Sequence, residues 1–337
     1  MNTGVSMALI GPLVAVMATA CAPLLNQPGK AIQKPQLSDD RFIANDGAIL
    51  PLRRWGPEKS PAQAVLIALH GFNDYSNFFD EPGKFLSHHG IRSYAYDQRG
   101  FGASTGHGLW PGIQGLTGDL KQFTRLVREQ HPGLPLYLLG ESMGGAVIMV
   151  AATDPDRPPE ALKADGIILA APAVWGRITM PWYQRLALWL SVRIMPGATL
   201  TGQGLRIMAS DNIEMLKALG RDRLVIKATR VDAIHGLTNL MDEALDRAAR
   251  FDSRALILYG RKDEVIPKKP TRLMLGRLPA AARQRVAVYK NGYHMLLRDL
   301  AAKVIWKDII HWIDDAATPL PSGAENGVDE WVKNNDH

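Results

Sequence analysis

LYLLGESMGGAVIMV, residues 136–150, is the stretch of sequence that decides the fold of this chain. Its apolar first four residues predict a short buried strand. The turn that follows matches the pattern G-x-S-x-G with Ser142 at its centre, and the small apolar residues after it predict a buried helix. A serine on such a turn is held in a strained backbone conformation that raises its hydroxyl above the sheet. Ser142 is therefore the candidate nucleophile.

The neighbours of Ser142 fit the same interpretation. Gly140 and Gly144 remove Cβ atoms from the most crowded positions of the turn. The backbone amide of Met143, at the start of the helix, points to where a negatively charged oxygen would form. We therefore expect Met143 to provide one amide of an oxyanion hole. An ordinary serine in a glycine-rich turn is the alternative, and the flanking strand and helix argue against it.

Strand-like and helix-like segments alternate on both sides of this stretch. Further strands are expected at residues 64–69, 91–96, 166–171, 255–259 and 285–289, and a hairpin over 41–55 turns at Asn45-Asp46-Gly47. Helices are expected at residues 76–89, 113–130 and about 299–313. This alternation predicts an α/β fold with a mostly parallel central sheet and helices on both faces.

Residues 172–250 interrupt the alternation because they contain no convincing core strand. Within them, residues 180–195 are apolar and aromatic, with only Arg185 and Arg193 charged. We expect this segment to form a helical cap over the site, of a kind that suits a long acyl chain or a membrane surface. Simple packing of the cap onto the domain is the alternative for any single side chain.

The N-terminus has the pattern of a secretion signal. Residues 7–20 form an apolar run too short for a comfortable membrane span, and it ends directly before Cys21, the only cysteine. The run resembles a bacterial lipoprotein signal, in which the cysteine becomes the lipidated first residue. Residues 1–6 lack Lys and Arg, however, and Ala18 stands where Leu is usual. A plain secretory signal or an uncleaved apolar tail are the alternatives.

These segments give a domain organisation and a cellular location. We expect a lipoprotein-type signal peptide over 1–21, a tether over 22–40, the α/β domain over 41–315 and a flexible tail over 316–337. A lipidated Cys21 would anchor the protein in the bacterial cell envelope. Resemblance to bacterial lipoproteins implies their sorting habit, under which Ala22 rather than Asp after the cysteine would favour the outer membrane, with the protein facing the periplasm.

Composition and charge exclude some classes of function. Hydrophobic residues make up 46% of the 337 residues, enough for a sizeable core. The formal charge is only +6, from 39 Lys and Arg against 33 Asp and Glu, and no dense basic run suggests nucleic acid. One cysteine allows no intramolecular disulfide, and no Cys/His cluster suggests zinc.

Two later loops provide partners for Ser142. A serine hydroxyl is a poor nucleophile near neutral pH and needs a histidine as base and a carboxylate to orient that histidine. In this architecture both follow late strands, in the order serine, acid, histidine. Asp263 follows the strand at 255–259 and is the candidate acid, with the adjacent Glu264 as the alternative. His294 follows the strand at 285–289 and is the candidate base.

The loop after the strand at 64–69 should provide the second amide of the oxyanion hole. It reads His70-Gly71-Phe72, and the amide of Phe72 is the candidate donor because Gly71 lets the backbone come close. His70 precedes Ser142, against the expected order of the base, and we expect it to support this loop. The other histidines considered are interpreted as surface or packing residues: His88, His89, His235 and His311.

Together these motifs resemble the monoacylglycerol lipase and lysophospholipase group of serine α/β-hydrolases, which is similar to serine aminopeptidase S33. The matching segments are residues 70–72, 97–104, 140–145, 259–263 and 292–294. The resemblance implies the α/β-hydrolase fold and hydrolysis of a single-chain lipid ester, such as a monoacylglycerol or a lysophospholipid, with no metal or organic cofactor. Residues 97–104 are interpreted as a structural turn near the site.

The resemblance leaves the substrate open, because relatives include esterases, peptidases and carbon–carbon bond hydrolases. A short-chain esterase or a peptidase is one alternative, and a non-catalytic lipid-binding lipoprotein is another. The chain also departs from the family pattern at Glu141, where family members commonly have His. Glu141 should lie beside the nucleophile without joining the triad, so we expect it to affect the pH profile rather than the mechanism.

Overall fold

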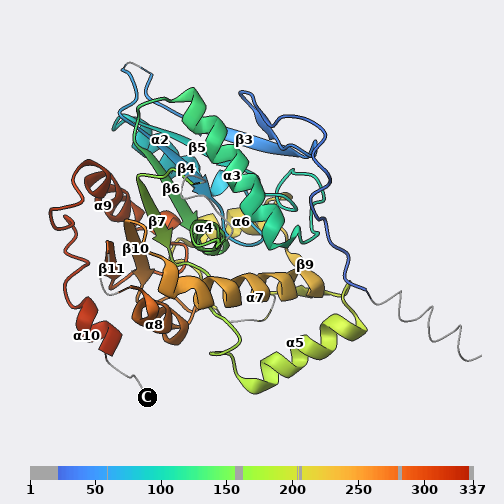
Figure 1. Ribbon diagram of the computed structural model, residues 1–337. Helices are drawn as coiled ribbons and strands as arrows, with labels where there is room; N and C mark the ends of the chain where they lie inside the picture. The colour runs from blue at the N-terminus through green and yellow to red at the C-terminus, as the bar shows by residue number, and fades with distance from the viewer. Residues whose placement is uncertain are drawn as a thin grey trace, which may run out of the picture.

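The computed structural model describes residues 22–58, 60–155, 162–202, 204, 207–279 and 283–333. Within these residues the centre of the molecule is a nine-stranded sheet in the order β1-β2-β3-β5-β4-β6-β7-β10-β11 (Figure 1). The neighbouring strands β5, β4, β6, β7, β10 and β11 run parallel, and β1, β2 and β3 add an antiparallel edge. The bounds are β1 Gln36–Leu37, β2 Arg41–Ile43, β3 Ile49–Trp55, β4 Ala64–Leu69, β5 Ile91–Tyr96, β6 Leu136–Glu141, β7 Gly166–Ala170, β10 Ala255–Gly260 and β11 Gln284–Tyr289.

Helices cover both faces of this sheet (Figure 1). One face packs against α3, α4, α7 and α8, and the other against η1, α2, η3 and α9. The helix bounds are η1 Ser76–Phe79, α2 Asp80–Ser87, α3 Gly112–Gln130, α4 Met143–Ala152, α5 Trp182–Ile194, α6 Ile213–Arg221, α7 Val231–Asp246, η2 Arg247–Arg250, α8 Lys268–Arg277, η3 Leu296–Arg298, α9 Ala302–Asp314 and α10 Val328–Lys333. This arrangement confirms the predicted α/β-hydrolase fold with a mostly parallel sheet.

Strand β4 shows why its sequence forms a central strand. All six of its residues are buried, as expected where helices cover both faces of a sheet. Val65, Ile67 and Leu69 join the core on the α3 and α4 side, whereas Leu66 and Ala68 join the core on the α2 and α9 side. Alternate residues of a strand point to opposite faces, so a continuous apolar run serves both cores.

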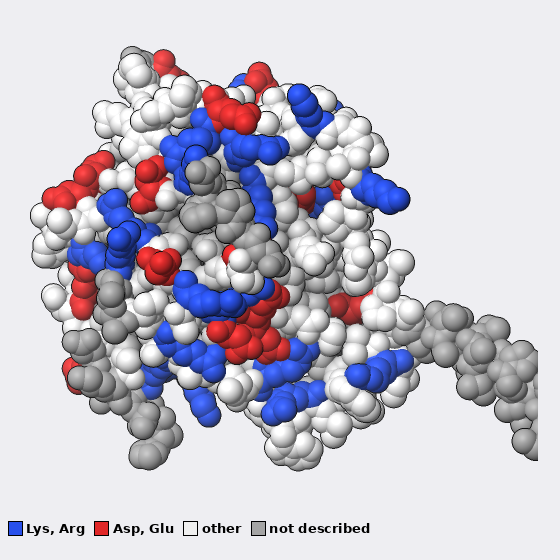
Figure 2. Space-filling model, in the orientation of Figure 1, with Lys and Arg blue, Asp and Glu red and all other residues white. Residues whose placement is uncertain are grey.

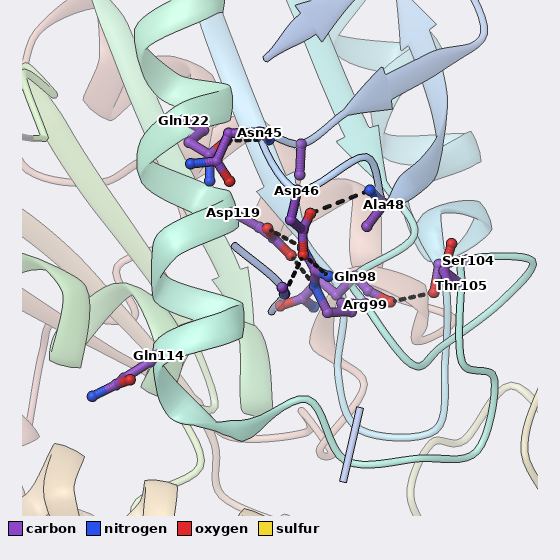
Figure 3. Close-up of polar contacts among 12 residues, drawn as sticks. Asn45, Asp46, Ala48, Gln98, Arg99, Ser104, Thr105, Gln114, Asp119 and Gln122 are labelled. Carbon is purple, nitrogen blue, oxygen red and sulfur yellow. Dashed lines mark hydrogen bonds and ion pairs between the residues drawn. The ribbon is translucent and has the colours of Figure 1, made fainter. Parts of the chain in front are cut away.

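The loop after β5 is fixed by a buried arginine (Figure 3). Arg99 forms ion pairs with Asp46 of the β2–β3 hairpin at 2.7 Å and with Asp119 of α3 at 2.8 Å. All three side chains are almost fully buried, so the pairs are shielded from water. The contacts tie the loop to two other elements, which supports the interpretation of residues 97–104 as a structural turn.

The insertion between β7 and β10 is helical, as expected for the cap. It contains α5, α6 and α7 and a separate pair of short antiparallel strands, β8 Thr199–Thr201 and β9 Ala228–Arg230. Helix α7 packs against α4 and contributes Leu240 and Met241 to the core. Helix α5, in contrast, leaves most of its large apolar side chains exposed.

Residues 22–35, which belong to the segment predicted as a tether over 22–40, lie against the domain. The amide of Leu24 donates a hydrogen bond to Asp232 at 3.1 Å, and that of Asn26 donates to the carbonyl of Trp110 at 2.9 Å. Strand β1 then pairs with β2. These contacts are made largely by the backbone, so the polar composition of the segment gave no sign of them.

Residues 316–333 are also ordered on the domain, and the prediction of a flexible tail was wrong for them. The amide of Val288 in β11 donates to the carbonyl of Ala324 at 2.8 Å, so the segment covers the edge of the sheet. Arg285 pairs with Glu325, and Leu320 is buried. Trp331 is 3% exposed and packs on Tyr259 with a ring-centroid distance of 5.0 Å.

The predicted signal peptide over 1–21, with Cys21, lies outside the described residues. Among the helices of the described ranges, none combines the length and the apolar character needed to cross a membrane.

Candidate active site

Ser142 lies on a strained turn between β6 and α4. Its backbone has φ 51° and ψ −114°, in the left-handed half of conformational space that a residue with a side chain rarely adopts. Two glycines make the turn possible. A Cβ atom on Gly140 would lie 2.4 Å from the nitrogen of Gly145, and one on Gly144 would lie 2.3 Å from the carbonyl oxygen of Leu69. The turn therefore has the geometry that the sequence predicted for a nucleophile.

His294 and Asp263 form a buried hydrogen-bonded pair. Nδ1 of His294 lies 2.8 Å from Oδ2 of Asp263, and both residues are 6% exposed. The other oxygen of Asp263 accepts hydrogen bonds from the amides of Val265 at 2.8 Å and Ile266 at 2.9 Å. The loop after β10 thus fixes the carboxylate, and the carboxylate fixes the imidazole.

The side chain of Glu264, the alternative acid, bonds to the cap insertion and not to His294. Its Oε2 accepts a hydrogen bond from the amide of Met208 in the cap insertion at 2.7 Å. The structure therefore favours Asp263 over Glu264 as the partner of His294.

The pKa of His294 reflects this pairing. Burial lowers the pKa of the imidazole, because it disfavours the charged form. The charge of Asp263 and the hydrogen bond to it raise the pKa by more, and the charge of Glu141 adds to them. The net result is a pKa above the ordinary value of a histidine. His294 is thus prepared to accept a proton.

The order of the strands explains how distant residues share one site. Ser142, Asp263 and His294 follow the carboxyl ends of β6, β10 and β11, which run parallel on the same side of the sheet. The loop after β4 reaches the same edge. A Cβ atom on Gly71 would lie 3.4 Å from Cβ of Ser142, so the backbone of this loop passes directly beside the candidate nucleophile.

That loop and the start of α4 offer two amides near Ser142. Within the described chain, the amides of Phe72 and Met143 donate no backbone hydrogen bond. Both adjoin Ser142, Met143 in the chain and Phe72 through Gly71, where donors to an oxyanion are required. His70 lies beneath the loop, fully buried, with Nδ1 2.8 Å from the carbonyl oxygen of Gly71. This contact is the loop support that we expected of His70.

Other histidines have partners of their own. Nδ1 of His89 lies 2.9 Å from the carbonyl oxygen of Phe85, and Nε2 of His311 lies 2.7 Å from the hydroxyl of Thr318. His88 is exposed, and His235 lies on α7 in the cap insertion. These contacts agree with their interpretation as surface or packing residues. Among the described residues, no group of three or more His, Cys, Asp and Glu side chains could hold a metal ion.

A buried charged cluster beside the triad was not foreseen. Arg298, four residues after His294, pairs with Asp74 at 2.7 Å and with Glu141 at 2.8 Å. Glu141 directly precedes Ser142, and Asp74 lies in the loop of His70. In the sequence, only Glu141 stands out among the three, as a departure from the family pattern. The short spacing of Arg298 from His294 was the one local signal for its involvement.

Comparisons with known proteins identify a family for this chain. The family model for serine aminopeptidase, S33, matches residues 60–301. The chain is similar to a monoacylglycerol lipase of Mycolicibacterium smegmatis, at 26% identity over 82% of this chain and 96% of the relative. It is also similar to an uncharacterized abhydrolase domain-containing protein of Dictyostelium discoideum, at 22% identity over 82% of this chain, but it spans only 29% of that protein.

A solved structure is similar in fold. It is a soluble variant of the monoglyceride lipase of Saccharomyces cerevisiae in complex with a substrate analog. The two chains align with a TM-score of 0.67 at 21% identity, over 87% of this chain and 99% of the yeast chain.

Proposed function

The chain belongs to the serine aminopeptidase S33 family, and from this premise we propose that it is a serine hydrolase of single-chain lipid esters, such as monoacylglycerols or lysophospholipids. The observation that carries the proposal is the strained turn of Ser142 at the same sheet edge as the hydrogen-bonded pair His294–Asp263. A strained serine with a paired histidine and carboxylate, in this chain order, is the arrangement that α/β-hydrolases use for acyl transfer.

The residues of the site have distinct roles in the proposed reaction. The hydroxyl oxygen of Ser142 attacks the ester carbonyl carbon while Nε2 of His294 takes the hydroxyl proton. Asp263 holds Nδ1–H and stabilises the imidazolium that forms. The amides of Phe72 and Met143 donate to the negative oxygen of the tetrahedral intermediate.

The intermediate then collapses. His294 gives its proton to the leaving alcohol, and an acyl group remains on Ser142. A water molecule, deprotonated by His294, attacks this acyl group, and the carboxylic acid leaves as the proton returns to Ser142. The mechanism needs no further reactant than the ester and water.

The preference for a lipid ester is supported by the cap. Helix α5 leaves Trp182 72% exposed and Trp189 50% exposed, with further apolar side chains beside them. The relatives named above as monoacylglycerol and monoglyceride lipases support the same substrate class. A large exposed apolar patch on a protein fits a lipid surface or a lipid substrate.

We also infer that α5 meets a membrane to which Cys21 anchors the chain. Helix α5 carries Arg185 and Arg193 and no acidic residue, and the region over it in Figure 2 is largely uncharged with Lys and Arg at its borders. Asp232 connects the N-terminal segment that follows Cys21 to the end of α5. Its carboxylate accepts from the amide of Leu24, and its own amide donates to the carbonyl of Pro196, just after α5, at 3.0 Å.

Cys21 precedes Leu24 by three residues, which reach at most about 11 Å. A lipid on Cys21 would therefore hold α5 near the same bilayer, in the bacterial cell envelope and by expectation at the periplasmic side of the outer membrane. Mass spectrometry of the mature protein tests this. An acylated Cys21 at the N-terminus is the expected result, and an intact Met1 would contradict it.

Hydrolysis assays with purified protein test the function. Monoacylglycerols and lysophospholipids of increasing chain length should be cleaved faster as the chain grows, and Ser142→Ala should abolish cleavage. Cleavage of short esters alone would keep the mechanism and replace the lipid assignment with a short-chain esterase. Cleavage of aminoacyl amides alone would indicate a peptidase. A folded protein that does not react with a fluorophosphonate would indicate a non-catalytic lipid-binding protein.

A further inference from the structure

Three loops of the candidate active site meet at one buried arginine. Nη2 of Arg298 contacts Oδ2 of Asp74 at 2.7 Å and Oε1 of Glu141 at 2.8 Å. Asp74 belongs to the loop that carries Phe72, and Glu141 ends the strand that carries Ser142. Arg298 itself follows His294 by four residues. One side chain thus connects the oxyanion loop, the nucleophile turn and the histidine loop.

With both of its carboxylates ionised, the cluster carries an uncompensated charge. Two carboxylates and one guanidinium give −2 + 1 = −1 in formal charge, in a region with little access to water. Oε2 of Glu141 is buried and has no hydrogen-bond partner among the described residues. A buried carboxylate oxygen without a partner is costly, so a compensating interaction is expected at some stage of function.

His294 is the group that can compensate this charge. The charge of Glu141 favours the protonated form of His294, whereas the charge of Arg298 opposes it. Burial raises the pKa of Glu141, but the charges of Arg298 and His294 lower it in part. The imidazolium that forms when Ser142 is deprotonated would therefore meet a negative cluster beside it, in addition to Asp263.

The other charged groups packed around the cluster have their own partners. Asp97 accepts from the amides of Ser76 at 3.0 Å and Ala103 at 2.8 Å. Asp299 accepts from the hydroxyl of Ser210 at 2.6 Å and from the amide of Tyr293 at 2.8 Å.

His70, the other nearby imidazole, is held neutral. Burial lowers its pKa, and its ring is engaged by the carbonyl of Gly71 and the amide of Gln98. His294 is thus the group next to the cluster whose charge changes in the proposed reaction.

We propose that Arg298 is a positioning residue that fixes the oxyanion loop and the nucleophile turn relative to His294, and that the carboxylate of Glu141 stabilises the positive charge that forms on His294. The inference rests on the proposed function, because it concerns the proton that His294 takes from Ser142. It assigns to Glu141 a role in stabilising the charge of His294, in addition to the role of Asp263.

The pH dependence of fluorophosphonate labelling at Ser142 tests the proposal without reference to any ester. The labelling rate rises with pH as His294 loses its proton, and the midpoint of this rise reports the charge around the imidazole. The net charge of the cluster is 0 in Glu141→Gln, −1 in the wild type and in the double variant Glu141→Gln/Arg298→Gln, and −2 in Arg298→Gln.

The midpoint should follow this order. We expect Glu141→Gln to lower it by about 0.5 to 1 pH unit and Arg298→Gln to raise it, while the double variant stays near the wild type. Arg298→Gln should also lower kcat for an ester severalfold with little change in KM, because the amides of the oxyanion hole are then no longer held in position beside Ser142. Glu325→Gln, which breaks a half-buried ion pair with Arg285 remote from the site, is the control and should leave the midpoint unchanged.

Distinct outcomes separate the two claims. A wild type that is not labelled at any pH would overturn the proposed function itself. A labelled wild type that shares its midpoint with folded Glu141→Gln would overturn this inference alone. If Arg298→Gln does not fold, the comparison of Glu141→Gln with the wild type decides, because Glu141→Gln keeps Arg298 and removes only the charge of Glu141.

Discussion

His70 and Gln98 are joined by two hydrogen bonds that determine which way the loop after β4 faces. The amide of Gln98 donates to Nε2 of His70 at 2.9 Å, and the side-chain amide of Gln98 donates to the carbonyl of His70 at 2.9 Å. Because Nε2 accepts, this network assigns the ring proton to Nδ1, which donates to the carbonyl of Gly71. The peptide is planar, so fixing that carbonyl also directs the amide of Phe72 to the opposite side.

We therefore predict that His70→Ala lowers kcat about 10- to 100-fold, somewhat less than the loss of an oxyanion donor itself. The pH profile should keep its shape, because burial lowers the pKa of His70 and the ring is already neutral in the working range. Steady-state kinetics across pH test both statements. His131→Ala, which removes a ring bonded to the hydroxyl of Tyr94 at 2.7 Å, is the control. A normal kcat in His70→Ala would contradict the role of the loop.

The adjacent residues Asp263 and Glu264 allow a direct test of which carboxylate orients His294. We expect Asp263→Asn to lower kcat by about 10³- to 10⁴-fold, because the imidazole then loses the carboxylate that holds its tautomer and its charge. Glu264→Gln should change kcat less than about threefold, since its carboxylate bonds the amide of Met208 instead. Kinetics on one ester, with folding checked by circular dichroism, suffice. The reverse order of effects would assign the acid to Glu264.

The acid limb of the pH profile should reflect His294. The imidazole must be neutral to take the proton of Ser142, so activity is lost below its pKa and appears as the pH rises through it. Asp263 raises this pKa above its ordinary value, against the opposing effect of burial. We expect the midpoint of kcat/KM to lie above the reference value of about 6.5. A midpoint below that value, measured with a neutral substrate, would contradict the pairing.

Much of the fold could be predicted because its signals are local. The apolar run at 64–69 and the hairpin turn at Asn45-Asp46-Gly47 predicted strands that match β4 and the hairpin of β2 and β3, in which Ile43 pairs with Ile49. The parallel order then brings loops after different strands to one edge. This is why Asp263 and His294, chosen by their positions after two strands, are hydrogen-bonded in the structure.

Contacts between distant segments could not be predicted in this way. Arg298 meets Asp74 and Glu141 only because three loops converge, and no periodicity in the sequence marks such a meeting. The N-terminal segment binds through backbone amides such as that of Leu24, which composition does not reveal. The C-terminal segment is polar overall, and its docking depends on a few apolar side chains, of which Trp331 is the largest.

Trp331 therefore provides the sharpest test of the docked C-terminus. Its ring is 3% exposed, packs on Tyr259 and lies 5.0 Å from the guanidinium carbon of Arg272. We expect Trp331→Ala to lower the free energy of unfolding by about 3 kcal/mol, because a buried indole is removed from both contacts.

Trp182→Ala makes the same chemical change at a side chain that is 72% exposed, so it should alter stability by less than about 0.5 kcal/mol. Urea unfolding followed by circular dichroism compares the two variants directly. Equal stabilities would mean that Trp331 contributes nothing to the folded state, and that the segment over the edge of β11 is not held by it.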